Sequence, residues 1–501
     1  MSKKKKSTII NMIIMTLYQL VTVAIGFVVP KLLMSKYGAT LHGYTSTVNN
    51  VMSYVALLNA GLATASVQSL YAPLAVGDKE KVSSTLKAVD RMYIKTGCYY
   101  MVAILGCAVV LPLVIKDQIP SITAFGLMIT MGATNTLECF IYSKYRVLLQ
   151  ADQRLYIVTL GDIVALIIRG FLQVALISHG ASIILVQAVS VLMVFIRMAF
   201  VSIYVHKNYT YIDSDAKPNY DALSKRKSAF VHQIASIVVN NTDVMILTVR
   251  GSLVSVSIYS VYNLVCTHIN TLLSYVFLHG VVASFGQMLG EDRKERVLKM
   301  FRAYEYIYLL TITIVFSVTA AMLLPFVSLY TKSVPGTNYS DVFLVLLFVV
   351  VGLVNNLRIP CLTMINAAGM FAETQHAAVI EAILNICISL VLVNCLGMYG
   401  LLIGTIVSFL YRTVDIMVFT NHKILHQTVT VSIFRAVRVI FTVIINVLII
   451  NYALGTGEVT SWLSWGIVAV ESTISASLVS VFIYVISEFK QTKDIVKTIK
   501  L

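Results

Sequence analysis

Long apolar runs dominate this sequence and leave few ways for it to fold. A helix needs about 20 predominantly apolar residues to cross the hydrocarbon core of a bilayer. Fourteen such stretches follow one another, near residues 8–28, 44–70, 92–115, 120–143, 155–178, 181–205, 229–249, 253–280, 305–330, 341–367, 374–396, 398–420, 434–453 and 461–487. The composition agrees, because 58% of the residues are hydrophobic and 12% are charged. The sequence therefore predicts an all-α, polytopic membrane bundle of 14 transmembrane helices, with no loop long enough for a soluble domain.

The distribution of lysine and arginine predicts how the bundle is oriented in the cell membrane. Most of the 38 basic residues lie at the two termini and in the loops on their side. The opposite loops hold only Lys31, Lys36, Lys116, Arg250 and Lys332. Because cytoplasmic loops carry the excess of positive charge, both termini are predicted to be cytoplasmic. The formal charge of +15 follows largely from this bias and does not indicate a nucleic-acid partner.

The first half of the chain resembles the second half. Gly38, Asn50 and Gly77 recur with the same spacing as Gly251, Asn263 and Gly290. A charged connector with the same order of signs follows in each half, at 79–93 and 294–308. Each repeat then holds six helices, an even number, so the two halves insert with the same orientation. Transporters built from such parallel repeats place substrate between two lobes.

The repeat divides the chain into five predicted parts. These are an N-terminal six-helix lobe at 1–206, a cytoplasmic linker at 207–228, a C-terminal six-helix lobe at 229–425, helices 13 and 14 at 430–487, and a basic cytoplasmic tail at 488–501. The last two helices fall outside the repeat.

Ionisable and amide side chains inside the apolar stretches are the candidate substrate ligands. A charged group near the bilayer centre costs roughly 2.5–3.5 kcal/mol on insertion scales, so it usually faces a partner or a water-filled cavity. Arg358 is the first candidate, because no acid lies three or four residues away and Pro360 interrupts the helix beside it. Arg412 is the second candidate. It is equally expected to form an ion pair with Asp415, which lies three residues away, and then to have no substrate role. The remaining candidates are Asn240, Asn241, Asp243, Asn355, Glu381, Asn385 and Lys31.

Several of these polar side chains also have an explanation that needs no substrate. Serine, threonine and asparagine inside membrane helices often form hydrogen bonds between helices. Asp162 and Arg169 share a helix face two turns apart, so each needs a partner elsewhere. Arg197 lies toward the cytoplasmic end of its stretch, and we expect its side chain to extend to the membrane surface.

No residue pattern indicates catalysis, a metal or a cofactor. All seven cysteines lie inside apolar stretches and none forms a C-x-x-C pair, which favours buried thiols. His422 and His426 are four residues apart but lack the intervening glutamate of a zinc protease. We therefore expect a protein that is not an enzyme and that has no catalytic residues, no metal and no cofactor.

Short strings spread over nearly the whole chain resemble one family of membrane transporters. The strings are Val29-Pro30-Lys31 with Tyr37-Gly38, Tyr71-Ala72-Pro73-Leu74, Ala151-Asp152-Gln153, Asn241-Thr242-Asp243, Arg358-Ile359-Pro360, Ala367-Ala368-Gly369 with Glu373-Thr374-Gln375, and Ile380-Glu381-Ala382. In this order they resemble the polysaccharide-exporter branch of the multidrug/oligosaccharidyl-lipid/polysaccharide (MOP) flippase superfamily. Within that branch the resemblance is to the Wzx-type flippases of capsule and exopolysaccharide assembly.

The resemblance implies a transporter that opens alternately inward and outward. It would carry undecaprenyl-diphosphate-linked oligosaccharide to the outer leaflet through a cationic cavity, among membrane lipids, with a polysaccharide polymerase and glycosyltransferases as pathway partners. Lipid II flippases of the superfamily hold several arginines on their first two helices, whereas this chain has only Lys31 and Lys36 beyond its first helix. This difference argues against lipid II and moves the expected phosphate site to the second lobe.

Three other functions stay open at this stage. A cation-coupled multidrug antiporter of the same fold would use carboxylates such as Asp243 and Glu381. A membrane-embedded polysaccharide polymerase or glycosyltransferase would need a sizeable loop or an acid motif at the interface, and the longest loop, at 206–228, has no obvious one. The third is a non-transporting scaffold of cell-envelope or spore assembly, against which the charges inside the helices are only a weak argument.

Overall fold

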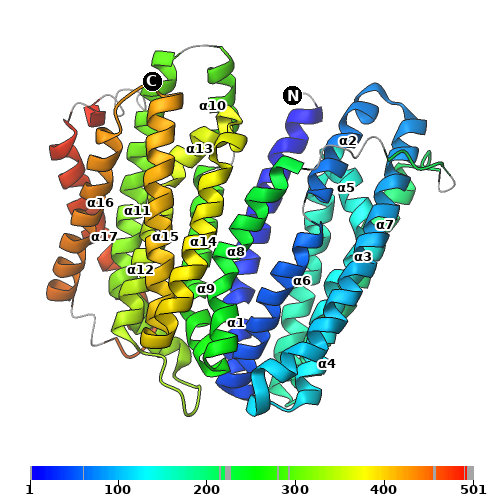
Figure 1. Ribbon diagram of the computed structural model, residues 1–501, viewed down its shortest axis with the longest axis horizontal. Helices are drawn as coiled ribbons and strands as arrows, with labels where there is room; N and C mark the ends of the chain where they lie inside the picture. The colour runs from blue at the N-terminus through cyan, green and yellow to red at the C-terminus, as the bar shows by residue number, and fades with distance from the viewer. Residues whose placement is uncertain are drawn as a thin grey trace. The chain divides into compact units, whose positions relative to one another are not determined.

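The computed structural model describes residues 3–59, 61–213, 216–220, 227–278, 281–291, 294–454, 459–489 and 491–493. Within these ranges the chain is almost entirely helical and has no β-strand (Figure 1). Eleven of the described helices are long and apolar enough to cross a membrane, or twelve if α9 (Leu253–Phe277) and α10 (Val281–Gly290) form one bent span. The predicted all-α membrane architecture is therefore confirmed, while the count of fourteen spans stays a prediction.

Two compact units make up the chain, residues 1–257 and 258–501. The first holds α1 (Lys3–Val55), η1 (Ala56–Asn59), α2 (Leu62–Val76), α3 (Lys79–Ile115), η2 (Lys116–Gln118), α4 (Ser121–Leu137), η3 (Glu138–Tyr142), α5 (Ser143–Ala151), α6 (Leu155–Ser178), α7 (Ile183–Asn208) and α8 (Lys227–Arg250). The second holds α10, α11 (Lys294–Thr331), α12 (Val342–Leu357), α13 (Ile359–Ala368), α14 (Phe371–Leu396), α15 (Met398–Phe419), η5 (Thr420–Ile424), α16 (Thr430–Leu454) and α17 (Trp462–Ser487). Helix α9 crosses the boundary, because its first turn belongs to the first unit.

Helix α1 is two helical segments joined at Gly38. This residue has φ 84° and ψ 171°, a conformation that glycine adopts without steric cost. The predicted stretches 8–28 and 44–70 therefore meet at a sharp break rather than at a separate loop. The second stretch is itself interrupted, because α1 ends at Val55 and α2 begins after Gly61, which has φ 74°. Apolar content alone predicted one continuous helix over residues 44–70, because the interruption between Val55 and Leu62 depends on backbone conformation.

Helix α8 packs against α1 within the first unit. The Thr47 and Thr248 hydroxyl groups lie 2.8 Å apart, and the Tyr54 hydroxyl lies 2.9 Å from that of Thr242. After Arg250, the last residue of α8, the chain turns into α9, where a Cβ added to Gly43 would lie 1.7 Å from the Leu253 carbonyl oxygen. Only glycine permits this approach of two backbones. The compact unit thus includes the helix that opens the second sequence repeat, and the predicted lobe boundaries stay a prediction.

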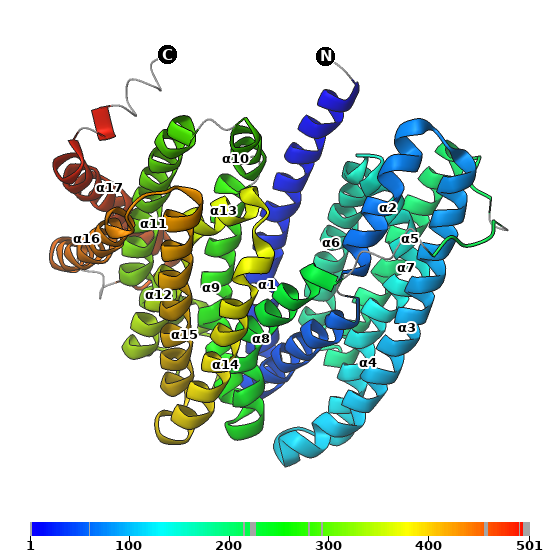
Figure 2. The same ribbon diagram turned by 45° about the horizontal axis from the view of Figure 1, so that its top comes forward.

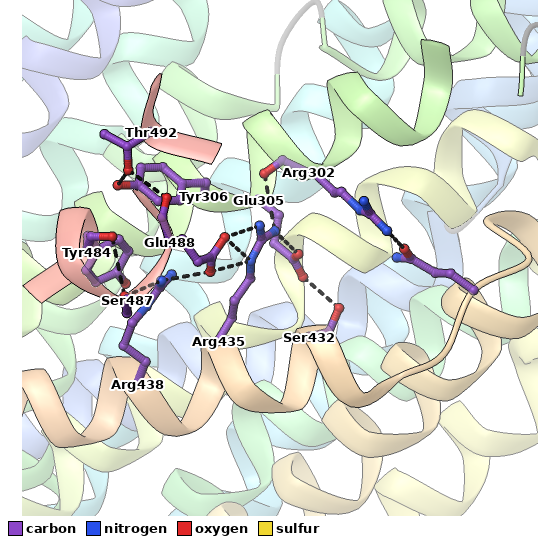
Figure 3. Close-up of polar contacts among 11 residues, drawn as sticks. Arg302, Glu305, Tyr306, Ser432, Arg435, Arg438, Tyr484, Ser487, Glu488 and Thr492 are labelled. Carbon is purple, nitrogen blue, oxygen red and sulfur yellow. Dashed lines mark hydrogen bonds and ion pairs between the residues drawn. The ribbon is translucent and has the colours of Figure 1, made fainter. Parts of the chain in front are cut away.

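Helices α16 and α17 are joined to α11 by a buried ionic network (Figure 3). Arg435, which is 1% exposed, lies 2.6 Å from Glu305 of α11 and 2.5 Å from Glu488 at the end of α17. Arg438 lies 2.7 Å from the other Glu488 oxygen, and its guanidinium stacks 3.7 Å from the centre of the Tyr484 ring. Ser432 also donates a hydrogen bond to Glu305 at 2.9 Å. We call Glu305, Arg435, Arg438 and Glu488 the helix clasp.

The charge on Glu488 depends on the helix clasp. Burial opposes its ionisation, but hydrogen bonds and charges from Arg435 and Arg438 outweigh burial and hold the pKa of this carboxyl below its usual value. The carboxylate is therefore ionised at neutral pH, and both arginines are matched by negative charge.

Removing the arginine at the centre of the helix clasp should destabilise the protein. The substitution Arg435→Met keeps the volume but leaves Glu305 buried without its partner, and breaking a buried pair in this way costs about 3–5 kcal/mol. Thermal unfolding of the purified protein in lipid nanodiscs measures the effect. Lys81→Met is the control, because the Lys81–Asp78 pair is solvated, with Lys81 69% exposed, and such a pair contributes about 0–1 kcal/mol.

Thermal unfolding also distinguishes the loss of an ion pair from the loss of side-chain packing. The double variant Arg435→Met, Glu305→Gln removes the buried pair together and leaves Glu488 matched by Arg438, so it should recover much of the lost stability, because no ion is left unpaired. Equal stability of Arg435→Met and wild type would contradict the structural role of the helix clasp.

Candidate functional site

Arg358 lies where one membrane span is broken into two helices. Helix α12 ends at Leu357 and α13 begins at Ile359, although both belong to a single 27-residue span, Val342–Ala368. Pro360 lacks a backbone N–H and cannot continue the hydrogen-bond ladder of α12. The break predicted beside Arg358 is therefore present, and it presents the arginine side chain inside the span.

The Arg358 side chain is held by three neighbours. One terminal nitrogen donates a hydrogen bond to Glu381 Oε1 of α14 at 2.5 Å, and the other donates to Asn355 Oδ1 at 2.7 Å. The guanidinium carbon lies 4.6 Å from the centre of the Phe409 ring of α15. These contacts fix the plane of the guanidinium while the side chain keeps 14% of its surface exposed.

Glu381 links Arg358 to a second arginine. Its other oxygen lies 3.6 Å from Nε of Arg412 on α15, and Arg412 donates to Asp415 Oδ2 at 2.6 Å. The predicted Arg412–Asp415 pair is therefore formed. Arg358, Glu381, Arg412 and Asp415 alternate in sign and come from three consecutive segments of the second unit, and we call them the charge chain.

Close packing of α14 and α15 supports the charge chain, and the two helices lie side by side (Figure 2). A Cβ added to Gly404 would lie 2.5 Å from Ser389 Oγ. One turn away, Asn385 donates a hydrogen bond to Thr405 Oγ1 at 3.0 Å and is fully buried. Asn385 therefore joins two helices here, and its role as a substrate ligand stays a prediction.

The charge chain is formally neutral, which defines what it can bind. An anion that binds Arg358 must replace or weaken the contact with Glu381. A cation must instead compete with an arginine for Glu381 or Asp415, and the Asp415 side chain is 32% exposed. Within the described part of the chain, Arg358 Nε has no hydrogen-bond acceptor. The charge chain can thus bind an anion at Arg358 in place of Glu381, or a cation at Asp415 in place of Arg412.

The other predicted ligands belong to the first unit. Asn240 and Asn241 on α8 donate to the carbonyl groups of Ser236 and Ile237, at 2.7 and 2.8 Å. Asp243 on the same helix is 3% exposed, and Lys31 on α1 is half-buried. The structure therefore brings Arg358, Arg412, Asn355, Glu381 and Asn385 together, and it places Asn240, Asn241, Asp243 and Lys31 in the other unit. Their roles stay predictions.

The first unit contains an ionic cluster that the sequence did not reveal. Arg197 of α7 contacts both Glu138 and Asp162 Oδ1, the latter at 3.3 Å. Tyr142 donates to the same Asp162 oxygen at 3.2 Å. Glu138 and Tyr142 bound the π-helical turn η3, a type of helix defect that is frequent at functional sites. Two carboxylates therefore hold Arg197 within the first unit, and its extension to the membrane surface stays a prediction. The sequence signals for this cluster were Asp162 and Glu138, two carboxylates inside apolar stretches without a partner on their own helix.

The sequence matches no protein-family model and no curated protein. Solved structures do match. One is the inward-facing conformation of a multidrug resistance MATE family transporter of the MOP superfamily, with TM-score 0.65 and 13% identity, over 82% of this chain and 95% of that chain. Another is lipid II flippase MurJ in an inward closed conformation, with TM-score 0.62 and 13% identity, over 95% and 99% of the two chains.

A third similar structure is a MOP superfamily transporter from Pyrococcus furiosus whose binding pocket is described as having reverse polarity. Its TM-score is 0.53 at 12% identity, over 85% of this chain and 98% of that chain. Identities this low show the fold alone. The chain has the fold of the MOP superfamily transporters, a superfamily that includes MATE multidrug transporters and the MurJ flippase.

Proposed function

We propose that this protein is a flippase that moves undecaprenyl-diphosphate-linked oligosaccharide across the cytoplasmic membrane, as a Wzx-type member of the polysaccharide-exporter branch. In this proposal it works by alternating access of two parallel six-helix lobes among fourteen spans, with both termini in the cytoplasm. Its pathway partners are a polysaccharide polymerase and glycosyltransferases. The single observation that supports the proposal most is Arg358, an arginine that lies at a helix break inside a span and keeps part of its surface exposed.

Arginine suits a diphosphate head for a physical reason. It stays charged in an apolar site and donates two parallel hydrogen bonds that match phosphate oxygens. In the resting protein Glu381 occupies this fork at 2.5 Å. We propose that the incoming phosphate takes the place of Glu381 on Arg358, and that Glu381 then remains neutralised by Arg412. Amide and hydroxyl groups around the charge chain supply partners for the sugar.

The membrane potential favours the proposed direction. It contributes about 2.3 kcal/mol for each elementary charge and each 100 mV. A diphosphate with about two negative charges therefore gains about 4–5 kcal/mol per 100 mV on moving outward, if both charges cross the full field. The protein then needs mainly to shelter the head group at mid-membrane.

A cation-coupled multidrug antiporter of the same fold is the second candidate. It is favoured by the formal neutrality of the charge chain and by the exposed carboxylate of Asp415. The variant Glu381→Gln distinguishes the two candidate functions when both polymer export and organic-cation efflux are measured. Loss of organic-cation efflux with unchanged polymer export would favour the antiporter, whereas the flippase proposal expects export to change.

Substituting Arg358 should impair polymer export. In cells that depend on this chain for export, Arg358→Ala should reduce surface polymer by about 10- to 100-fold, the range expected when a charged hydrogen bond is lost. Arg358→Lys should restore only part of it, because lysine keeps the charge but not the planar fork. The measurement is surface polymer at matched protein abundance. Arg91→Ala, at an exposed position of α3, is the control and should export normally.

A double variant distinguishes binding from structure. Arg358→Gln with Glu381→Gln leaves neither charge unpaired, so the fold should be retained. If Arg358 only neutralised Glu381, this variant would export normally, and the site assignment would be wrong. The proposal instead expects export to stay low.

The proposed orientation is tested by labelling single cysteines. The seven native cysteines are free thiols, so they are first replaced by serine or alanine. Cysteines at Lys81 and Arg296 should then react only after the membrane is permeabilised, and those at Lys36 and Lys332 should react in intact cells, because basic loops stay inside. External labelling at Arg296 would contradict the parallel repeat.

A further inference from the structure

Arg169 is a charged residue in the middle of a membrane span. It lies on α6 nine residues before Ser178, so about 13 Å of helix separate it from the outer end at 1.5 Å per residue. The cytoplasmic end, at Leu155, is farther away. A side chain at this depth cannot easily reach the head-group region, unlike the basic residues near helix ends.

Arg169 has no counter-charge in the described part of the chain. It forms no hydrogen bond and no ion pair there, and its Nε is buried without an acceptor. The ionisable groups that act on its charge are Arg197, which repels it, and Tyr18. Other arginines inside the spans are matched, because Arg197, Arg358, Arg412 and Arg435 each contact a carboxylate.

Two carboxylates of the same unit, Asp162 and Glu138, are already engaged by another arginine. Asp162 lies two turns before Arg169 on the same face of α6, but it accepts from both Arg197 and Tyr142. Glu138 also contacts Arg197. The cluster around η3 therefore engages Arg197 with two carboxylates and leaves Arg169 without one in the described residues. Ionisable groups in this position usually face a cavity and lie on the path of a ligand.

We propose that Arg169 binds the phosphate of the transported lipid and gives the first unit an anion contact of its own. The inference rests on the proposed flippase function and deepens it, because it names a second residue for the phosphate head. An unpaired guanidinium offers a bidentate fork without first releasing an internal carboxylate, which Arg358 must do. The bound phosphate in turn supplies the counter-charge that the unit lacks.

Binding of a short polyprenyl diphosphate tests the assignment. The full chain is placed in nanodiscs of zwitterionic lipid, and farnesyl diphosphate is titrated by calorimetry. Arg169→Gln should weaken binding by about tenfold or more, and Arg169→Lys should be intermediate. Arg146→Gln, at an exposed position of α5, is the matched control and should bind like wild type. Farnesol, which lacks the phosphates, should show no dependence on Arg169.

Each other outcome overturns the inference. Equal affinity of Arg169→Gln and wild type means that Arg169 does not contact the phosphate. Dependence on Arg169 that appears only with phosphatidylglycerol in the disc assigns the site to bilayer lipid instead. A loss of thermal stability in both Arg169→Gln and Arg169→Met means that the residue is structural. The proposed function fails separately, through normal export by the Arg358 variants, so the two failures are distinguishable.

Discussion

A charge inside a bilayer is costly unless it faces a partner or a water-filled cavity, and this constraint explains the ionic groups that join helices in this molecule. Isolated ions in the hydrocarbon core cost several kcal/mol, so arginines and carboxylates of different helices are drawn together. Three such groups occur in the described residues: the charge chain, the Arg197 cluster and the helix clasp. Each group joins helices that are separate elements of the chain. The ionic groups therefore join particular helices, in addition to the close backbone packing at Gly43 and Gly404.

The same constraint gives the structure its capacity to change partners. In the charge chain Glu381 lies between Arg358 and Arg412, so it can lose one partner and keep the other. In the helix clasp Arg435 is 1% exposed and surrounded by carboxylates, which leaves no room for a ligand. Differences in exposure thus separate an ionic group suited to binding from one suited to holding helices. This is why the candidate site lies at α12–α15 and not at α16–α17.

The sequence predicted the features that depend on residues close to one another in the sequence. The apolar runs predicted membrane helices, Pro360 predicted the break beside Arg358, and the three-residue spacing predicted the Arg412–Asp415 pair. The partner of Arg358 was not predictable, because Glu381 reaches it from another helix and helical spacing carries no information across helices.

The remaining differences have the same origin. Arg197 has its two carboxylate partners, Glu138 and Asp162, on other segments, so neither contact could be predicted from its own helix. Arg435 and Arg438 lie at the start of an apolar stretch, where basic residues fit the cytoplasmic charge bias, and their pairing with Glu488 depends on how α16 and α17 pack. The break at Gly38 depends on a backbone conformation that composition does not report.

The central claim, that this protein moves an anionic lipid-linked sugar, is tested most directly in proteoliposomes. The purified chain is reconstituted with a short-chain polyprenyl-diphosphate oligosaccharide that carries a fluorophore on the sugar, and the fraction protected from a membrane-impermeant quencher is followed over time. The account predicts protein-dependent movement between leaflets that is faster when the potential favours outward transfer of negative charge and slower with Arg358→Ala. Movement no faster than in protein-free liposomes, together with efflux of an organic cation by the same preparation, would contradict it.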